Sequence, residues 1–165
     1  MHTAEIAKSL TTLFSELVDG ADASGAAYML NSGDAGLLRS LDKLSAEDAS
    51  HSIHGGATIA AHARHLRYGL TLMNRWATEG GDPFSDALWD EAWKTTSVDD
   101  SEWAGVRQGL RDEAHRWLQS LNVPREVTSE GLSGMIGSIA HLAYHLGAVR
   151  QIAAGARGPK EGTFR

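Results

Sequence analysis

Four of the eight histidines form two pairs, each spaced so that its imidazole groups could act together on one helix face. In the segment SIAHLAYHLGAVRQIAAG, residues 138–155, His141 and His145 stand four positions apart in a run that otherwise has the composition of a buried helix. Residues four apart project from one helix face, so we expect these imidazoles to lie one turn above the other. In TIAAHARHLRYGL, His62 and His65 stand three apart, about 60° around a helix axis.

Both histidine pairs have small or apolar neighbours on the same helix face. Those neighbours are Ser138, Ala148, Val149 and Ile152 for the later pair, and Ile59, Leu66, Gly69 and Leu72 for the earlier one. Each buried polar group without a partner costs about 1–3 kcal/mol, so four inward imidazoles need partners. A divalent metal would supply one, because neutral imidazole binds Zn, Ni, Cu and Fe. Satisfaction by other protein groups remains open on spacing alone.

Other metal motifs are not supported. HLAYH has the spacing of a zinc-protease motif, but Leu142 stands where the general-base Glu is needed. A di-iron site needs several Glu-x-x-His pairs, and the nearest match, Asp112 with His115, is expected on an exposed helix face. The chain has no cysteine, which excludes thiolate metal sites and cysteine nucleophiles.

Composition limits the partners and the compartment. The 165 residues predict one domain, 1–165, and the net charge of −6 without a basic run argues against nucleic-acid binding. No apolar run reaches the ~18–20 residues of a membrane span, and the N-terminal segment lacks the apolar core of a signal peptide. The lack of cysteine fits a reducing compartment, so we expect a cytoplasmic protein that does not contact membranes.

The hydrophobic periodicity and the stop signals predict an all-α fold, a four-helix bundle with short additional helices. Thr58 and either Asp99 or Asp100 are the expected N-caps of the second and third long helices, and Ser129 or Glu130 opens the fourth. The expected helices are 3–19, a short one at 36–44, 58–78, one or two turns within 86–93, 99–121, and 129–155. We expect the tryptophans to pack in the core or between helices; they are Trp76, Trp89, Trp93, Trp103 and Trp117.

The segments TIAAHARHLRYGLTLMNRW and GMIGSIAHLAYHLGAVRQI together resemble the DinB-like superfamily of bacterial four-helix-bundle proteins. Members bind a divalent metal through three histidines: one on the second helix just before a Leu, and two in H-x-x-x-H on the last helix. The resemblance therefore implies His65, His141 and His145 as metal ligands, with His62 as an outer-sphere residue or an alternative ligand. The chain departs from the pattern at Ala148, where Gln is common, and lacks the usual Trp early in the second helix.

The resemblance also implies function. Three neutral histidines leave a coordination position open, as in catalytic sites, where a metal lowers the pKa of water towards ~7 or activates a thiolate. Known activities in the family include transferases and isomerases that use low-molecular-weight thiols. We therefore expect a Zn- or Ni-dependent thiol transferase or hydrolase with a small-molecule substrate, and a homodimer is a further expectation from the resemblance.

A second class of function stays open: a non-catalytic metal-binding or stress-response bundle. A general base or a substrate-binding group beside the open position would favour an enzyme. The sequence offers three candidates for such a group, His62, Tyr144 and Arg150, of which Tyr144 is as easily explained as a packing aromatic and Arg150 as a cation that interacts with the helix C-terminus.

Overall fold

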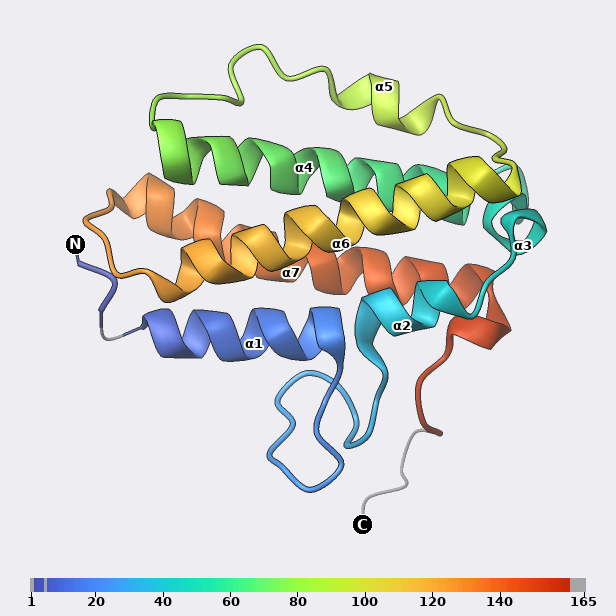
Figure 1. Ribbon diagram of the computed structural model, residues 1–165, viewed down its shortest axis with the longest axis horizontal. Helices are drawn as coiled ribbons and strands as arrows, with labels where there is room; N and C mark the ends of the chain where they lie inside the picture. Colours follow the sequence, from blue (N-terminus) through green and yellow to red (C-terminus); the bar gives the residue numbers. More distant parts are fainter. Residues whose placement is uncertain (1, 5, 161–165) are drawn as a thin grey trace.

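The computed structural model describes residues 2–4 and 6–160, and within them every regular element is helical. The only β pairing of these residues is an isolated bridge between His2 and Glu126. The expected all-α fold is therefore confirmed (Figure 1). The elements are α1 (Ala7–Asp19), α2 (Gly36–Asp42), α3 (Ala46–Ser50), α4 (Ile59–Glu79), α5 (Trp89–Trp93), α6 (Asp100–Asn122), α7 (Ser129–Ile152) and a 3₁₀ turn, Ala154–Ala156.

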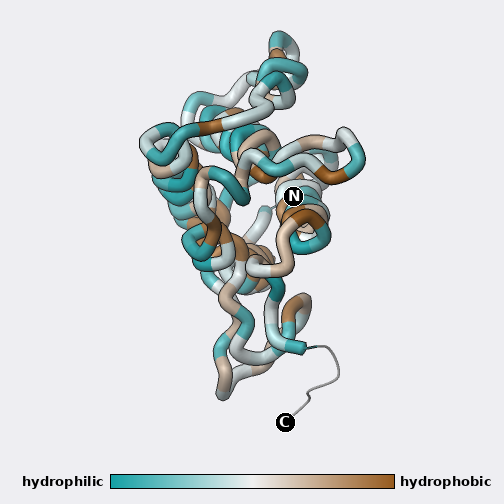
Figure 2. The backbone as a smooth tube through the Cα atoms, turned by 90° about the vertical axis from the view of Figure 1, so that its right-hand side faces the viewer, coloured by the Kyte–Doolittle hydropathy of each residue, from teal (hydrophilic) through white to brown (hydrophobic). Residues whose placement is uncertain are grey.

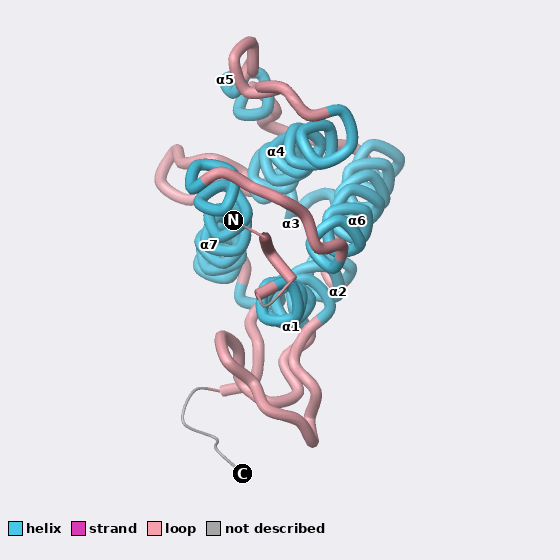
Figure 3. Tube along the Cα trace, turned by 90° about the vertical axis from the view of Figure 1, so that its left-hand side faces the viewer, coloured by secondary structure: helices cyan, strands magenta, loops and turns pink. Residues whose placement is uncertain are grey.

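The four long helices form a closed ring. α4 packs against α6 and α7, and α1 packs against the same two helices from the opposite side. Viewed from the end, the order around the ring is α4, α6, α1 and α7 (Figure 3). Each long helix carries both hydrophobic and hydrophilic residues (Figure 2), so each can turn one side to the centre and the other to solvent.

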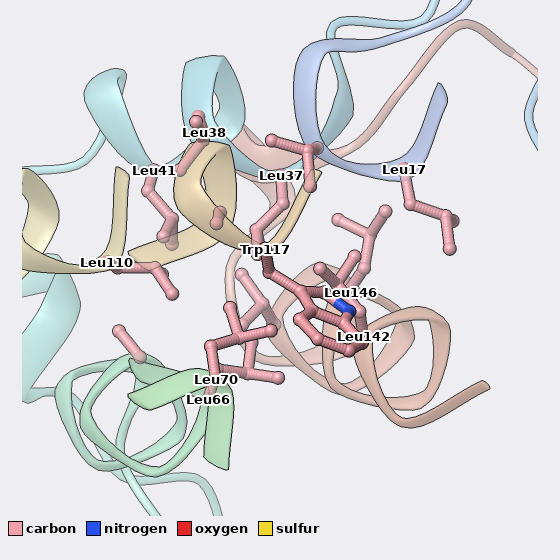
Figure 4. Packing of buried hydrophobic residues seen from close by; sticks show 14 of the residues in the cluster. Leu17, Leu37, Leu38, Leu41, Leu66, Leu70, Leu110, Trp117, Leu142 and Leu146 are labelled. Atoms are coloured by element: carbon pink, nitrogen blue, oxygen red, sulfur yellow. The ribbon is translucent and has the colours of Figure 1, made fainter. Parts of the chain in front are cut away.

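The centre of the ring is filled by leucines around one indole. Trp117 is fully buried and lies among leucines that α2, α4, α6 and α7 contribute (Figure 4). Its indole Nε1 donates to the Ser138 hydroxyl at 2.9 Å, so the ring's one polar group has a partner. Trp103 is also buried, and its Nε1 donates to the Leu44 carbonyl at 2.8 Å.

The N-caps of the long helices follow local chemistry. Thr58 caps α4 by accepting a hydrogen bond from the Ala61 amide, and Asp99 forms a reciprocal capping box with Glu102 at the start of α6. The Thr58 cap was expected, and of the two expected alternatives for α6, Asp99 and Asp100, the cap is Asp99. At the other end of α4, Gly80 has φ +72°, a left-handed conformation that suits glycine, and the helix ends there.

Several helix boundaries and one additional short helix differ from the sequence-based expectation. α7 ends at Ile152 instead of continuing to 155, because Ala153 adopts an extended backbone (φ −122°, ψ 116°) before the 3₁₀ turn. α3 was not expected, although Ser45 and Asp48 form the capping box that starts it. In the 86–93 segment only the last five residues are helical, and the first helix begins at Ala7 rather than at residue 3.

The loop between α1 and α2, residues 20–35, is held by a buried carboxylate. Glu16 is 6% exposed and accepts hydrogen bonds from the backbone amides of Tyr28, Met29 and Leu30, at 2.6–3.1 Å. A second buried acid, Asp34, accepts from Arg150 Nη2 on α7 at 2.6 Å and from the Gly36 amide at 2.8 Å. The loop is thereby attached to α1, α2 and α7.

The leucine core makes a quantitative prediction. Leu110 is fully buried on α6, so Leu110→Ala should lower the free energy of unfolding by about 2–5 kcal/mol through lost burial and the cavity left behind. The matched control is Leu88→Ala, because Leu88 is 66% exposed and should change stability by less than about 0.5 kcal/mol. Urea denaturation measures both, and equal losses in the two variants would contradict this packing.

Candidate metal centre

The histidine pairs meet because α4 and α7 run antiparallel in one register. A side chain at Gly131 would meet Trp76, one at Gly134 would approach Met73, and His62 contacts His145. The paired residue numbers all sum to 207, so the register is maintained along the length of the helices. Four imidazoles from two helices far apart in sequence therefore lie together, as the spacing of the histidines predicted.

Three of the imidazoles aim one nitrogen at a common point. The Nε2 atom of His141 lies 3.0 Å from Nε2 of His65 and 2.9 Å from Nε2 of His145. Ligand nitrogens of the three residues all lie within 4.8 Å of one another, so the group could hold a metal ion. Tetrahedral zinc with Zn–N bonds of 2.0–2.1 Å needs nitrogens about 3.3 Å apart, close to the spacing between these atoms.

Hydrogen bonding alone does not explain this cluster. A ring nitrogen of neutral imidazole carries either one hydrogen or one in-plane lone pair, so it makes one good hydrogen bond. Nε2 of His141 has two nitrogen neighbours at hydrogen-bond distance, and it can satisfy only one of them. A cation at the centre would accept the lone pairs of all three rings. The donor set therefore fits a divalent metal.

His62 lies behind this group and does not belong to it. Its Nδ1 is 2.8 Å from Nδ1 of His145, so the two rings share one hydrogen bond. When His145 donates in that bond, its Nε2 has no hydrogen and its lone pair faces the other two rings. Metal-binding histidines usually have such a partner on the second nitrogen, which fixes the tautomer and the ring orientation.

His65 is oriented by aromatic stacking instead. Its Nδ1 is buried and has no hydrogen-bond partner within the described residues. Its ring stacks on the indole of Trp93 with centroids 4.4 Å apart and an interplanar angle of 30°, and Trp89 lies 5.5 Å away. The His65 ring is thus bordered by two indoles. These apolar neighbours disfavour its protonated form and fix the orientation of the ring.

The indoles of α5 are the part of the centre that the sequence interpretation missed. Trp93 also lies 5.3 Å from the His62 ring and 5.9 Å from the His145 ring, so one side chain covers three histidines. It is 36% exposed and is therefore a cover rather than a core residue. Trp89 and Trp93 were expected only to pack in the core or between helices. Their contact with the histidines depends on how the segment after α4 folds back over the bundle, and the spacing of residues in the sequence does not indicate that path.

Burial controls the charge of the four imidazoles. Burial lowers the pKa of His62 and His141 below 6.5. Burial, followed by the neighbouring His141 and His62, lowers the pKa of His65 to about 4. Burial, with the three other histidines as the smaller cause, lowers the pKa of His145 to about 3. All four rings are neutral at pH 7, which is the form that binds a metal.

A large cleft opens beside His65 and His141. It has a volume of about 1040 Å³ and lies between α4, α7 and the segment that follows α4. Its α7 wall has glycine at three positions three residues apart, Gly131, Gly134 and Gly137, so no side chain projects from α7 at these positions. A Cβ at Gly137 would have no atom within 4 Å. The glycine spacing was visible in the sequence, but its meaning depends on the facing helix.

The remaining candidates lie elsewhere. Tyr144 is 70% exposed and places its ring edge-on to His145, with centroids 5.0 Å apart, so it stands at the rim of the centre. Arg150 is paired with Asp34 and therefore anchors the 20–35 loop rather than serving the histidines. His115 pairs with Asp19 at 2.9 Å, and His51 and His54 are exposed in the loop before α4.

Comparisons with protein-family models, with curated proteins and with solved structures found no match. Among the described residues, no helix combines the length and the apolar character that crossing a bilayer requires. Function must therefore be argued from the geometry of this centre.

The lowered pKa values predict how the stability of the metal-free protein depends on pH. The unfolded histidines titrate near 6.5 while the folded ones stay neutral, so the unfolded state binds more protons below that pH. The contribution of the neutral histidines to the free energy of unfolding is complete above about pH 6.5. It is lost as the pH falls towards the folded pKa values, about 4 for His65 and about 3 for His145. Thermal unfolding should show a lower Tm at pH 5 than at pH 7.5.

The dependence should diminish in His145→Gln, which cannot titrate, and should persist in His51→Gln, whose side chain lies on the surface. Identical pH profiles for the parent and His145→Gln would show that this imidazole is not kept neutral by the fold.

Proposed function

We propose that this chain is a metal-dependent enzyme of the DinB-like type, a four-helix bundle that binds one Zn or Ni ion through His65, His141 and His145. The observation that carries the proposal is the convergence of three imidazole nitrogens beside an open cleft. The ring of α1, α4, α6 and α7 supports the bundle assignment. His65 precedes Leu66 on α4, and H-x-x-x-H lies on the last long helix, as the resemblance requires.

An open coordination position separates an enzyme from a structural metal site. Structural zinc sites are closed by four protein ligands, whereas three histidines leave room for water or substrate. A metal in this position supplies Lewis acidity to an oxygen or sulfur atom of a bound molecule. The protein's own contribution is to keep three rings neutral and fixed, to cover them with Trp93, and to leave the cleft free for a substrate.

Two residues around the metal centre are candidates for supporting roles, His62 and Tyr144. His62 positions His145 through their shared hydrogen bond. Tyr144 contacts the His145 ring edge-on but does not line the cleft, so it is a weaker candidate for a group that touches substrate. Use of a low-molecular-weight thiol, assembly as a homodimer and a cytoplasmic location rest on the resemblance and the composition. A hydrolase and a thiol transferase both fit three histidines and an open position.

Zinc affinity of histidine variants tests the metal site. His65→Ala, His141→Ala and His145→Ala should each weaken binding by more than about 100-fold, because each removes a ligand. His62→Ala should weaken it by about 10–100-fold, the usual range for an outer-sphere partner. His115→Ala is the control and should match the parent. Competition with a chromophoric chelator at pH 7.5 measures the affinities, using protein without a histidine tag.

Circular dichroism of the metal-free variants establishes that each one folds. If His65→Ala binds zinc as the parent does while His62→Ala does not, the ligand on α4 is one turn earlier. If all four substitutions leave binding unchanged, the histidines are satisfied by the protein and the proposal fails.

Turnover distinguishes an enzyme from a metal-binding bundle without activity. The zinc-loaded protein should hydrolyse p-nitrophenyl acetate faster than zinc in buffer does. Alternatively, with a low-molecular-weight thiol added, it should speed the replacement of chloride in 1-chloro-2,4-dinitrobenzene by the thiol sulfur, with release of chloride and a proton. Removal of the metal by a chelator should abolish the rate, and added zinc should restore it. His141→Ala serves as the matched inactive control. A zinc-binding protein with neither activity would favour the non-catalytic alternative.

A further inference from the structure

We infer that the cleft accepts an elongated, largely apolar molecule with a cationic group at the end remote from the histidines. This inference rests on the proposed metal site, which would hold the other end of the molecule. It concerns the class of ligand, which neither the histidines nor the resemblance specifies. Three features of the cleft support it: its length, its walls and its charges.

The cleft is long and has two distinct ends. His65 and His141 line one end, and Glu130 and Asp82 line the cavity beyond Gly131, which lies opposite Trp76. His141 and Glu130 stand eleven positions apart on α7. At a rise of 1.5 Å per residue, that separation is about 17 Å along the helix. A ligand that reaches both ends is therefore extended.

The walls between the two ends are mostly apolar. One side consists of hydrophobic and aromatic side chains from α4 and the segment after it, and the other is the glycine face of α7. The apolar lining residues are Leu66, Leu70, Met73, Trp76, Phe84, Trp89 and Leu142. Clefts of this composition bury chains or rings of a ligand and leave orientation to a few polar groups.

The charges of the lining select the far end of the ligand. Among the described residues that line the cleft, Asp82 and Glu130 are the acidic side chains, and there is no Lys or Arg. Glu130 forms no ion pair within that part of the chain, and Asp82 Oδ1 accepts a hydrogen bond from the Phe84 amide at 3.0 Å. Two positive groups act on this end: Arg125, whose guanidinium carbon lies 5.9 Å from the Trp76 ring centroid, and the N-terminus of α7, which is equivalent to about half a positive charge. Their combined charge is smaller than that of the two carboxylates, so this end keeps a small negative charge.

The expected preference is moderate because both acids are exposed to solvent. Exposed ion pairs contribute little to binding free energy. A ligand with a cationic end should therefore bind only about 2- to 5-fold more tightly than one with an uncharged end. A carboxylate end should weaken binding by a similar factor. A ligand with phosphate or carboxylate at that end is thereby disfavoured.

Three ten-carbon hydroxamates with zinc-loaded full-length protein test the inference. The probes are 10-aminodecanohydroxamic acid, decanohydroxamic acid and the monohydroxamate of decanedioic acid, which share a metal-binding head and differ in the tail. Calorimetry should give affinities in that order, strongest first. Glu130→Gln should reduce the difference between the amine and the carboxylate, whereas Asp112→Asn, on the exposed face of α6, should not.

A second variant tests whether the chain of the ligand occupies the cleft. Gly137→Leu should weaken all three probes at least 10-fold without changing zinc affinity, because its side chain enters open space beside α7. Gly105→Leu, at an exposed and equally open helical glycine on α6, should leave the probes unaffected. Loss of zinc binding in the parent would overturn the proposed function; intact zinc binding with equal affinities, or with the carboxylate preferred, would overturn this inference alone.

Discussion

The antiparallel contact of α4 with α7 is the constraint on which the centre depends. If the pairing of the two helices shifted by one residue, each histidine would lie about 100° further around its helix axis and would no longer face its partner. The register is fixed outside the centre, where Trp76 fits against Gly131 and the leucines of both helices meet Trp117. The apolar core therefore places the imidazoles, which add hydrogen bonds between α4 and α7 through His62 with His145 and His65 with His141.

Much of the fold could be predicted because helix signals are local. Thr58, Asp99 and Gly80 act within one turn of themselves, and each starts or ends a helix as the sequence indicates. The α3 helix was missed although Ser45 and Asp48 carry its capping box, because five residues offer too little periodicity. The end of α7 was placed too late because the extended backbone at Ala153 has no strong local signal in a run of alanines.

In the metal centre too, the features set by local spacing could be predicted and those set by tertiary contacts could not. The histidines could be predicted because three- and four-residue spacings on a helix determine which side chains share a face. Trp93 could not, since it reaches His65 through a chain segment whose path depends on tertiary contacts. The hydrogen bond between His62 and His145 likewise exists only once two helices meet, so the sequence left His62 open between ligand and supporting residue.

The glycines of α7 show where stability and function conflict. Each glycine in a helix interior costs about 1 kcal/mol relative to alanine, and Gly134 and Gly137 have no Cβ contact closer than 3.9 Å to justify them as packing devices. A helix selected for stability alone would carry alanine there. Gly105 and Gly147 are equally open but do not line the cleft, so an open glycine alone does not mark a ligand site. What distinguishes Gly134 and Gly137 is that they line the cleft that His65 and His141 border. The proposed ligand would use this open wall, and alanine at these positions would narrow it while stabilising the helix.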